Sequence, residues 1–253
     1  MPWAKVTWEQ LLTIVAERGY LIPAIGEQYV ACASLLADSI CQHHPNANIT
    51  ILTQDQLPNG DLGGYANDWQ CFSASPYRQT IKLEADMICA GPIDHWWTLF
   101  EQRDVVVSQG CRDFYDQPGL SRYYRKIFDN NNLPDVYNAI TYWRRSQTAM
   151  EFFDLVRAIF THWAEYKTLL RFPDKEATTD VVYAMAAVIM GVEKVTLPAG
   201  LGPTIVHMKQ HMIGTATDNW TDELVWEHNP FRINTVAQWG LVHYHIKEWV
   251  NEQ

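Results

Sequence analysis

The sequence lacks the long apolar runs that mark membrane proteins and secreted precursors. Apolar stretches such as residues 181–190 are much shorter than the ~20 residues that span a bilayer. The first twenty residues carry acidic side chains among the apolar ones, which is unlike a signal peptide. We therefore expect a cytoplasmic protein with no membrane partner.

A cysteine pattern is also missing. The five cysteines are odd in number and include no C-x-x-C pair. Neither a disulfide framework nor a zinc site built from thiolates is therefore indicated. We expect reduced thiols that are mostly buried as small apolar groups.

Positive charge is scarce, because 19 Lys and Arg stand against 29 Asp and Glu, for a net charge of −10. This balance argues against a protein that binds polyanions over its whole surface. Residues 103–145 are the exception, with seven basic residues against five acidic ones. Aromatic residues are plentiful by contrast, with 11 Trp and 12 Tyr, and such rings often line sites where flat or ring-shaped ligands stack.

The first third of the chain has the pattern of a parallel sheet. Residues 20–25 form a short apolar run ending at Gly26, which predicts a buried strand. Apolar residues recur every three or four positions over 27–43, which predicts a helix, and the β-branched run 49–53 predicts a second strand. Strand, helix and strand in this spacing are typical of a βαβ unit.

We expect the whole chain, residues 1–253, to form one α/β domain. Its 47% of apolar residues suffices for a core of that size. Residues 8–17 form an amphipathic opening, and 54–74 and 109–134 are predicted loops. We expect strands over 80–87, 104–108, 137–143, 195–197 and 204–206, and helices over 94–102, 148–170, 179–190 and 236–249. His243 and His245 fall in the last of these, where Tyr244 and Trp249 indicate a packed helix.

Two acids close the predicted strand 80–87, at Glu84 and Asp86. Side chains two apart on a strand point the same way, and carboxylate oxygens suit hard divalent cations. The carboxyl end of a parallel strand is also where α/β sheets bind ligands. The pair therefore indicates a cation site, and the alternative is two solvated acids or a helix cap.

The order of these elements resembles the GT-A fold of nucleotide-sugar glycosyltransferases. That fold is a Rossmann-like, mixed and mainly parallel sheet flanked by helices, with an Asp-x-Asp motif that holds Mn²⁺ or Mg²⁺ against the donor diphosphate. Residues 75–86 (SPYRQTIKLEAD) are similar to the approach to that motif. The resemblance implies that Asp86 binds the metal and that Glu84, which replaces the first Asp, assists.

Three later segments extend the resemblance. Tyr137-Asn138-Ala139 is similar to the strand that faces the sugar in glycogenin-like enzymes, and Asp180 lies where they carry an Asp at a helix start. The resemblance implies catalytic roles for Asn138 and Asp180. The segment that begins Val206-His207-Met208-Lys209 is similar to the family's late His-and-Lys element, which implies His207 as a metal ligand and Lys209 as a phosphate contact.

Other residues are candidates for the donor nucleotide. Ala24, Ile25 and Gly26 lie at a strand-to-helix turn, where backbone amides can approach phosphate. Tyr29 could stack on a base, although a core position is the alternative. Arg78 and Lys82 could neutralise the diphosphate, and Lys82 could instead pair with Glu84. These are the residues that we expect to bind a UDP-sugar.

The acceptor prediction rests on the loop 109–134. This loop interleaves cations with aromatic rings, as in proteins that hold a phosphate backbone and stack a base: Arg112, Tyr115, Arg122, Tyr123, Tyr124, Arg125 and Lys126. The alternative is a solvated loop with ordinary surface arginines.

Residues 75–87 (SPYRQTIKLEADM), 94–97 (DHWW) and 122–139 also resemble segments of compact glycosyltransferase-like proteins encoded by tailed bacteriophages. Many phages carry glycosyltransferases that modify hydroxymethylated pyrimidines in their own DNA. The sequence hypothesis is therefore hexose transfer, with glucose as the expected sugar, from a UDP-sugar to such a base in the host cytoplasm. The alternatives are transfer to a glycan or protein hydroxyl, and a catalytically silent nucleic-acid-binding protein.

Overall fold

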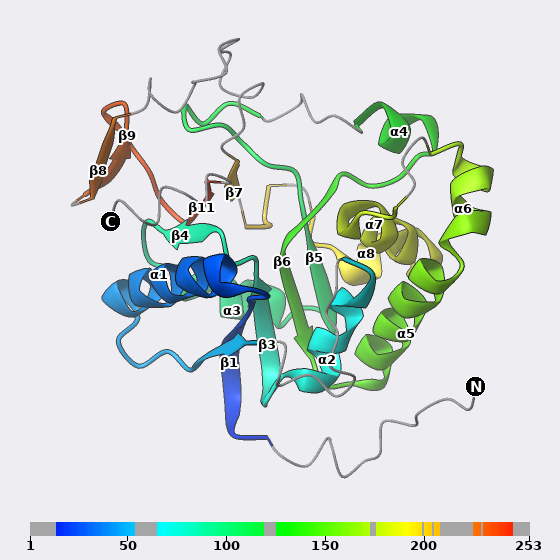
Figure 1. Cartoon of the computed structure of the whole chain (residues 1–253), viewed down its shortest axis with the longest axis horizontal. Helices are drawn as coiled ribbons and strands as arrows, with labels where there is room; N and C mark the ends of the chain where they lie inside the picture. Colours follow the sequence, from blue (N-terminus) through cyan, green and yellow to red (C-terminus); the bar gives the residue numbers. More distant parts are fainter. Residues whose placement is uncertain are drawn as a thin grey trace.

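A five-stranded sheet forms the centre of the computed structural model, which describes residues 14–53, 65–118, 125–172, 176–198, 200–203, 205–207, 225–228 and 230–244 (Figure 1). In spatial order the strands are β2 (Ile49–Leu52), β1 (Ala16–Pro23), β3 (Tyr77–Leu83), β6 (Val136–Arg144) and β5 (Val105–Gln109). β1 is parallel to β2 and β3, whereas β6 is antiparallel to both neighbours. The predicted mixed, mainly parallel α/β sheet is confirmed.

The predicted βαβ unit is present at the start of this sheet. Helix α1 (Glu27–His43) has the bounds that its periodicity predicts, and it buries Leu36 and Ile40. Gly26 precedes the helix with a φ of +89°, a backbone conformation that side-chain-bearing residues rarely adopt. The chain can therefore turn sharply from β1 into α1.

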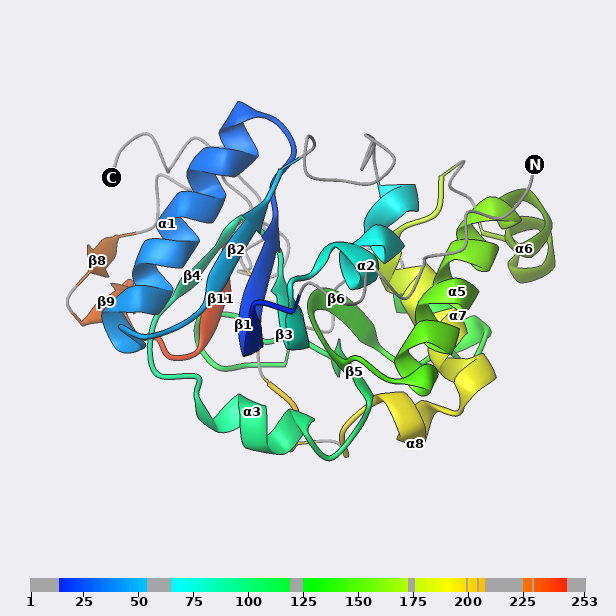
Figure 2. The ribbon, with the colours of Figure 1, turned by 90° about the horizontal axis from the view of Figure 1, so that it is seen from below.

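Helices cover both faces of the central sheet (Figure 2). Helices α1 and α3 (His95–Phe100) lie on one face. The other carries 3₁₀ helix η3 (Tyr65–Gln70) and helices α2 (Cys71–Ala74), α5 (Gln147–Thr161), α6 (Trp163–Leu170), α7 (Thr179–Met190) and α8 (Val192–Val195). Within β1, Tyr20 and Ile22 pack into one core and Leu21 into the other, as strand alternation requires.

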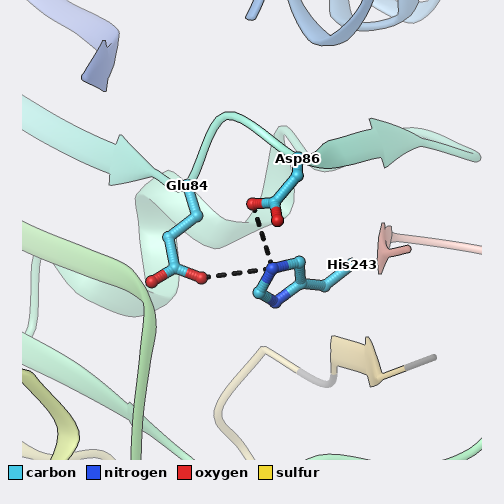
Figure 3. Close-up of side chains that lie close together, drawn as sticks. All are labelled: Glu84, Asp86 and His243. Atoms are coloured by element: carbon cyan, nitrogen blue, oxygen red, sulfur yellow. Dashed lines mark ion pairs between the residues drawn. The ribbon is translucent and has the colours of Figure 1, made fainter. Parts of the chain in front are cut away.

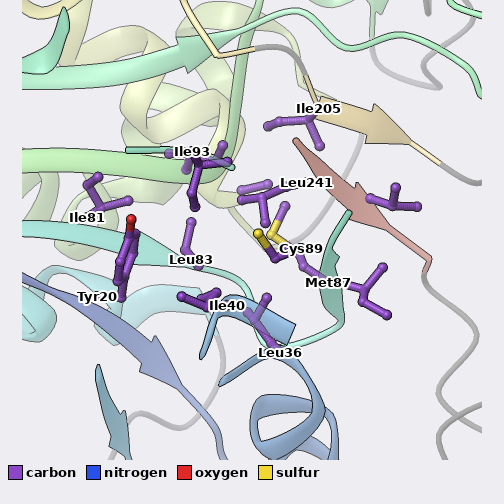
Figure 4. Packing of buried hydrophobic residues seen from close by; sticks show 14 of the residues in the cluster. Tyr20, Leu36, Ile40, Ile81, Leu83, Met87, Cys89, Ile93, Ile205 and Leu241 are labelled. Carbon is purple, nitrogen blue, oxygen red and sulfur yellow. The ribbon is translucent and has the colours of Figure 1, made fainter. Parts of the chain in front are cut away.

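A second, three-stranded sheet continues from the end of β3. It consists of β4 (Met87–Cys89), β11 (Leu241–His243) and β7 (Ile205–His207), with β11 in the middle, antiparallel to β4 and parallel to β7. Residues of β3 and of this sheet share one buried cluster, which includes Ile81, Leu83, Met87, Cys89, Ile205 and Leu241 (Figure 4). The junction between the two sheets is therefore packed.

A third sheet of short strands lies beside the second: β8 (Trp226–His228), β9 (Phe231–Ile233) and β10 (Val236–Ala237). The predicted helix over 236–249 is therefore wrong in its described part, because β10 and β11 occupy it. Gly240 adopts a φ of +72° between them, which an α-helix does not permit. Residues 245–249 lie outside the described part.

Other boundaries also differ from the sequence predictions. The predicted strand over 195–197 is wrong, since Val195 ends α8, and the long helix over 148–170 is divided at His162. The loops contain short helices, η3 and α2 in one and α4 (Arg125–Asn130) in the other. Residues 8–13 lie outside the described part, and β1 begins at Ala16. Among the described helices, none has the length and apolar character needed to cross a bilayer.

Candidate active site

Glu84 and Asp86 lie in the connection between the first two sheets. β3 ends at Leu83, so the acids follow the strand and are not part of it. The backbone N–H of Glu84 still donates to Ala139 O of β6 at 3.1 Å, and Tyr244 N donates to Asp86 O at 3.1 Å. One acid is thereby fixed to the central sheet and the other to the second sheet.

His243, the last residue of β11, completes a cluster with the two carboxylates (Figure 3). Its Nε2 lies 3.3 Å from Glu84 Oε2 and 3.0 Å from Asp86 Oδ1. The Tyr137 hydroxyl lies 2.5 Å from His243 Nδ1 and orients the ring from behind. One ligand atom from each of Glu84, Asp86 and His243 falls within 4.8 Å of the others, a spacing that one metal ion can bridge.

The electrostatics of the cluster also suit a cation. Asp86 and His243 are buried, and the Glu84 side chain keeps 32% of its surface exposed. Burial raises the pKa of Glu84, His243 opposes the rise, and Asp86 adds to it. Two carboxylates this close resist joint ionisation unless a positive charge lies between them. Two carboxylates and one imidazole are a suitable donor set for Mn²⁺ and also offer Mg²⁺ its oxygen ligands.

His207, the predicted histidine ligand, lies on the neighbouring strand and is not in this cluster. It is the register partner of His243 in the parallel pair β7–β11, and the two ring centroids are 5.8 Å apart. His207 is buried and packs on Tyr137 at 4.8 Å. The structure thus groups His243 with the carboxylates where the resemblance implied His207. Lys209 lies outside the described part.

Sequence reasoning missed His243 because the surrounding residues were interpreted as a helix. A signal was present: Leu241-Val242-His243 repeats the pattern of Ile205-Val206-His207, a short apolar run that ends in histidine. Two such runs can pair side by side and bring both histidines to one end.

The two predicted catalytic residues lie together. Asp180 is in the first turn of α7, and its Oδ1 accepts a 2.7 Å hydrogen bond from the backbone N–H of Asn138 in β6. The Thr141 hydroxyl donates to Asn138 Oδ1. Asp180 is close enough to Glu84 to raise its pKa. The pair therefore adjoins the carboxylate cluster on the α7 side of the sheet.

Lys82 has Asp68 as its hydrogen-bonded partner, whereas the sequence offered it a diphosphate or Glu84, and its charge acts on Glu84 only from a distance, by lowering the pKa of that carboxyl. It is fully buried, and its Nζ lies 2.7 and 2.8 Å from the two oxygens of Asp68 in η3. The Tyr183 hydroxyl donates to the same carboxylate. Burial lowers the pKa of Lys82, but Asp68 and Cys71 outweigh it, so the net shift is upward. The charge of Lys82 is thus neutralised inside the protein.

Arg78 is distant from the cluster. It lies near the start of β3, six residues before Glu84, which corresponds to about 20 Å along an extended chain. Its Nε forms an ion pair with Glu17 at 3.2 Å. This position does not fit a diphosphate contact near Asp86.

The predicted nucleotide turn lies at the same edge of the sheet as the carboxylate cluster. β1 and β3 are parallel, so the turn 24–26 and Glu84 follow strand ends at the same edge. Ala24 is buried, whereas Gly26 is exposed and Tyr29 is 36% exposed on α1. Their role as donor contacts stays a prediction.

Arg112, predicted to contact the acceptor, is buried at 4% exposure. Its Nη1 lies 2.6 Å from Asp116, and its Nη2 donates to Trp239 O at 3.1 Å. Tyr115 is 52% exposed. Arg122, Tyr123 and Tyr124 lie outside the described residues, as do the side chains of Arg125 and Lys126 at the start of α4.

We compared the chain with known proteins to identify its fold. No protein-family model and no curated protein matches the chain. Galactosyltransferase LgtC, solved with donor and acceptor sugar analogs, is 12% identical, with a TM-score of 0.52 over 92% of this chain and 94% of LgtC.

Two further structures are similar at lower scores. Glycosyltransferase GlyE of Streptococcus pneumoniae TIGR4 is 11% identical, with a TM-score of 0.49 over 93% of this chain and 60% of GlyE. A glycosyltransferase involved in glycosylation of the major capsid of PBCV-1 is 11% identical, with a TM-score of 0.48 over 94% and 100%. At such identity the likeness to LgtC establishes the fold, and the chain has the GT-A fold of nucleotide-sugar glycosyltransferases.

Proposed function

We propose that the protein is a metal-dependent glycosyltransferase that moves a hexose, with glucose as the expected sugar, from a UDP-sugar to a hydroxyl group. The observation that carries this proposal is the cluster of Glu84, Asp86 and His243 at the carboxyl edge of β3 in a GT-A fold. Ligands of α/β sheets bind at this edge. The proposal also explains why two acids and a histidine share a largely buried site.

In this proposal Glu84, Asp86 and His243 hold Mn²⁺ or Mg²⁺, which when bound offsets the negative charge of the leaving diphosphate. Coordination through His243 Nε2 requires the ring proton on Nδ1, where it is donated to Tyr137. Asp180 supplies negative charge beside the site, where a sugar that loses its leaving group becomes positive. Its hydrogen bond to Asn138 N holds that carboxylate in place.

The test is hydrolysis of UDP-glucose in the presence of Mn²⁺, which is measured as the amount of UDP released. We expect slow hydrolysis by the natural protein that stops when Asp86 is replaced by Asn. UDP-galactose in parallel identifies the preferred sugar. A protein that neither binds UDP nor hydrolyses either donor would contradict the proposal and favour the catalytically silent alternative.

The acceptor proposed from the sequence is a hydroxymethylated pyrimidine in phage DNA. The local excess of basic residues over 103–145 and the exposed Tyr115 support it, whereas the ion pair of Arg112 with Asp116 weakens it. Incubation of hydroxymethylated DNA with UDP-glucose and the protein, followed by mass spectrometry of the nucleosides, tests this acceptor. Unmodified nucleosides from a protein that hydrolyses UDP-glucose would direct attention to a glycan or protein hydroxyl.

A further inference from the structure

Two aromatic side chains are exposed on neighbouring loops beside the second sheet. Trp239, just before β11, is 51% exposed, and Tyr115 is 52% exposed. Gln238 Nε2 donates to Phe114 O at 2.9 Å, so a hydrogen bond joins the two loops. A large ring left in water forgoes the free energy of burial, and an exposed pair on joined loops is therefore a candidate contact surface.

Trp239 is held in a fixed position. The guanidinium of Arg112 lies 3.8 Å from the centroid of the indole, and Arg112 itself is buried. Asp116 holds one end of that guanidinium, and the backbone oxygen of Trp239 accepts from the other. Tyr115 is supported in turn by Phe114, with ring centroids 4.1 Å apart. Rings fixed before binding lose little conformational entropy when a ligand stacks on them.

The charges around the rings favour a neutral ligand. Asp116 neutralises Arg112 and leaves two-thirds of its own side chain exposed. Asp113 accepts from the backbone N–H groups of Tyr115 and Gln117, each at 2.9 Å. Because Asp116 and Arg112 together carry no net charge, Asp113 leaves this loop negative, which does not attract a phosphate backbone. The carboxylate oxygens of both acids can accept hydrogen bonds from the hydroxyl groups of a sugar.

The aromatic surface is also close to the metal cluster. Trp239 precedes His243 by four residues, so their Cα atoms are no more than about 14 Å apart. Arg112 forms a bridge with Val206 of β7, the strand next to β11. A short oligosaccharide can span this distance.

We propose that Trp239 and Tyr115 form a carbohydrate-binding surface and that the acceptor is an oligosaccharide, in place of the DNA acceptor expected from the sequence. One unit of the oligosaccharide stacks on Trp239 while another reaches the metal cluster. This inference rests on the proposed glycosyltransferase function for the second contact. The surface itself binds without donor or metal, which separates the two proposals experimentally.

The test is calorimetric binding of maltose through maltohexaose and cellobiose through cellohexaose to the full chain, without UDP-sugar or Mn²⁺. We expect the longer members of one series to bind and Trp239→Ala to weaken binding roughly tenfold or more, as for a buried aromatic contact. Trp239→Phe should retain most of the affinity, and Tyr115→Ala should lose part of it. Leu169→Ala, an exposed apolar position on α6, is the matched control and should bind normally.

Three results would contradict the inference. The inference is overturned if no oligosaccharide of either series binds, or if Trp239→Ala binds as tightly as the natural protein. It is also overturned if the surface instead binds single-stranded DNA containing hydroxymethylcytosine and loses it on Trp239→Ala. Hydrolysis of UDP-glucose, measured on the same samples, reports on the proposed function alone, since neither ring belongs to the cluster.

Discussion

At the scale of single residues, Asp86 and His243 are the side chains on which metal binding depends most, because both are buried and face each other at 3.0 Å. We expect Asp86→Asn to abolish hydrolysis of UDP-glucose with the fold intact. His243→Gln should raise the Mn²⁺ concentration for half-maximal activity by about 10–100-fold, whereas His207→Gln should raise it far less. Activity measured as a function of Mn²⁺ concentration tests all three variants. A large shift in His207→Gln with none in His243→Gln would restore the assignment made from the sequence.

Glu84 gives a prediction for stability against pH. Its pKa is raised above the ordinary value of 4.5 by burial and by Asp86. A raised carboxyl pKa contributes stability below pH 4.5 that is lost as the pH rises through the folded-state value. Ionised Glu84 is therefore a small cost at neutral pH without metal. We expect metal-free Glu84→Gln to unfold at a slightly higher temperature than the natural protein at pH 7, and at the same temperature near pH 4.

Thermal unfolding in a chelator, followed by circular dichroism, measures this difference. The expected rise is small because the side chain is partly solvated. Added Mn²⁺ should then stabilise the natural protein more than Glu84→Gln. If Glu84→Gln were less stable than the natural protein at pH 7, the Glu84 side chain would make stabilising contacts in the metal-free protein, contrary to this prediction.

At the scale of elements, the buried pair of Lys82 and Asp68 ties η3 to the central sheet, and Tyr183 of α7 joins it. Removing one partner leaves a buried charge alone, which costs about 3–5 kcal/mol. We expect Lys82→Met to lose that stability in denaturant unfolding and the double change Lys82→Met with Asp68→Asn to recover part of it. The raised pKa of Lys82 means that its contribution is complete at neutral pH and is lost only above the usual lysine range.

The first turn of α7 carries the charge beside the site, at Asp180. Asp180→Asn keeps an oxygen that can accept from Asn138 N and removes only the charge. We therefore expect lower turnover of UDP-glucose with UDP affinity unchanged, as measured by steady-state kinetics and calorimetry. Weaker UDP binding, or undiminished turnover, would count against a position near the sugar.

At the scale of the whole molecule, the metal cluster joins segments 157 positions apart, at Asp86 and His243. A cation that binds only the folded chain stabilises it by mass action, by about 2.7 kcal/mol at a hundred times its Kd. We expect Mn²⁺ to raise the unfolding temperature of the natural protein and a chelator to reverse the rise. Asp86→Asn should show neither effect. An equal response of both proteins would indicate that Mn²⁺ acts elsewhere.

Local periodicity in the sequence was enough to predict several elements: α1 and α7 match their predicted bounds, and Glu84 and Asp86 directly follow β3. Helical spacing and strand composition act between near neighbours, so the sequence records them directly. Which strands pair, and which side chains therefore meet, depends on contacts between distant segments that local patterns do not record. β11 is a three-residue strand that exists because β4 and β7 flank it, and this pairing brings His243 to the carboxylates. Both faces of β3 are covered, so the sequence pattern does not show on which face Lys82 finds a partner. The position of Asp68 in η3 supplies that partner.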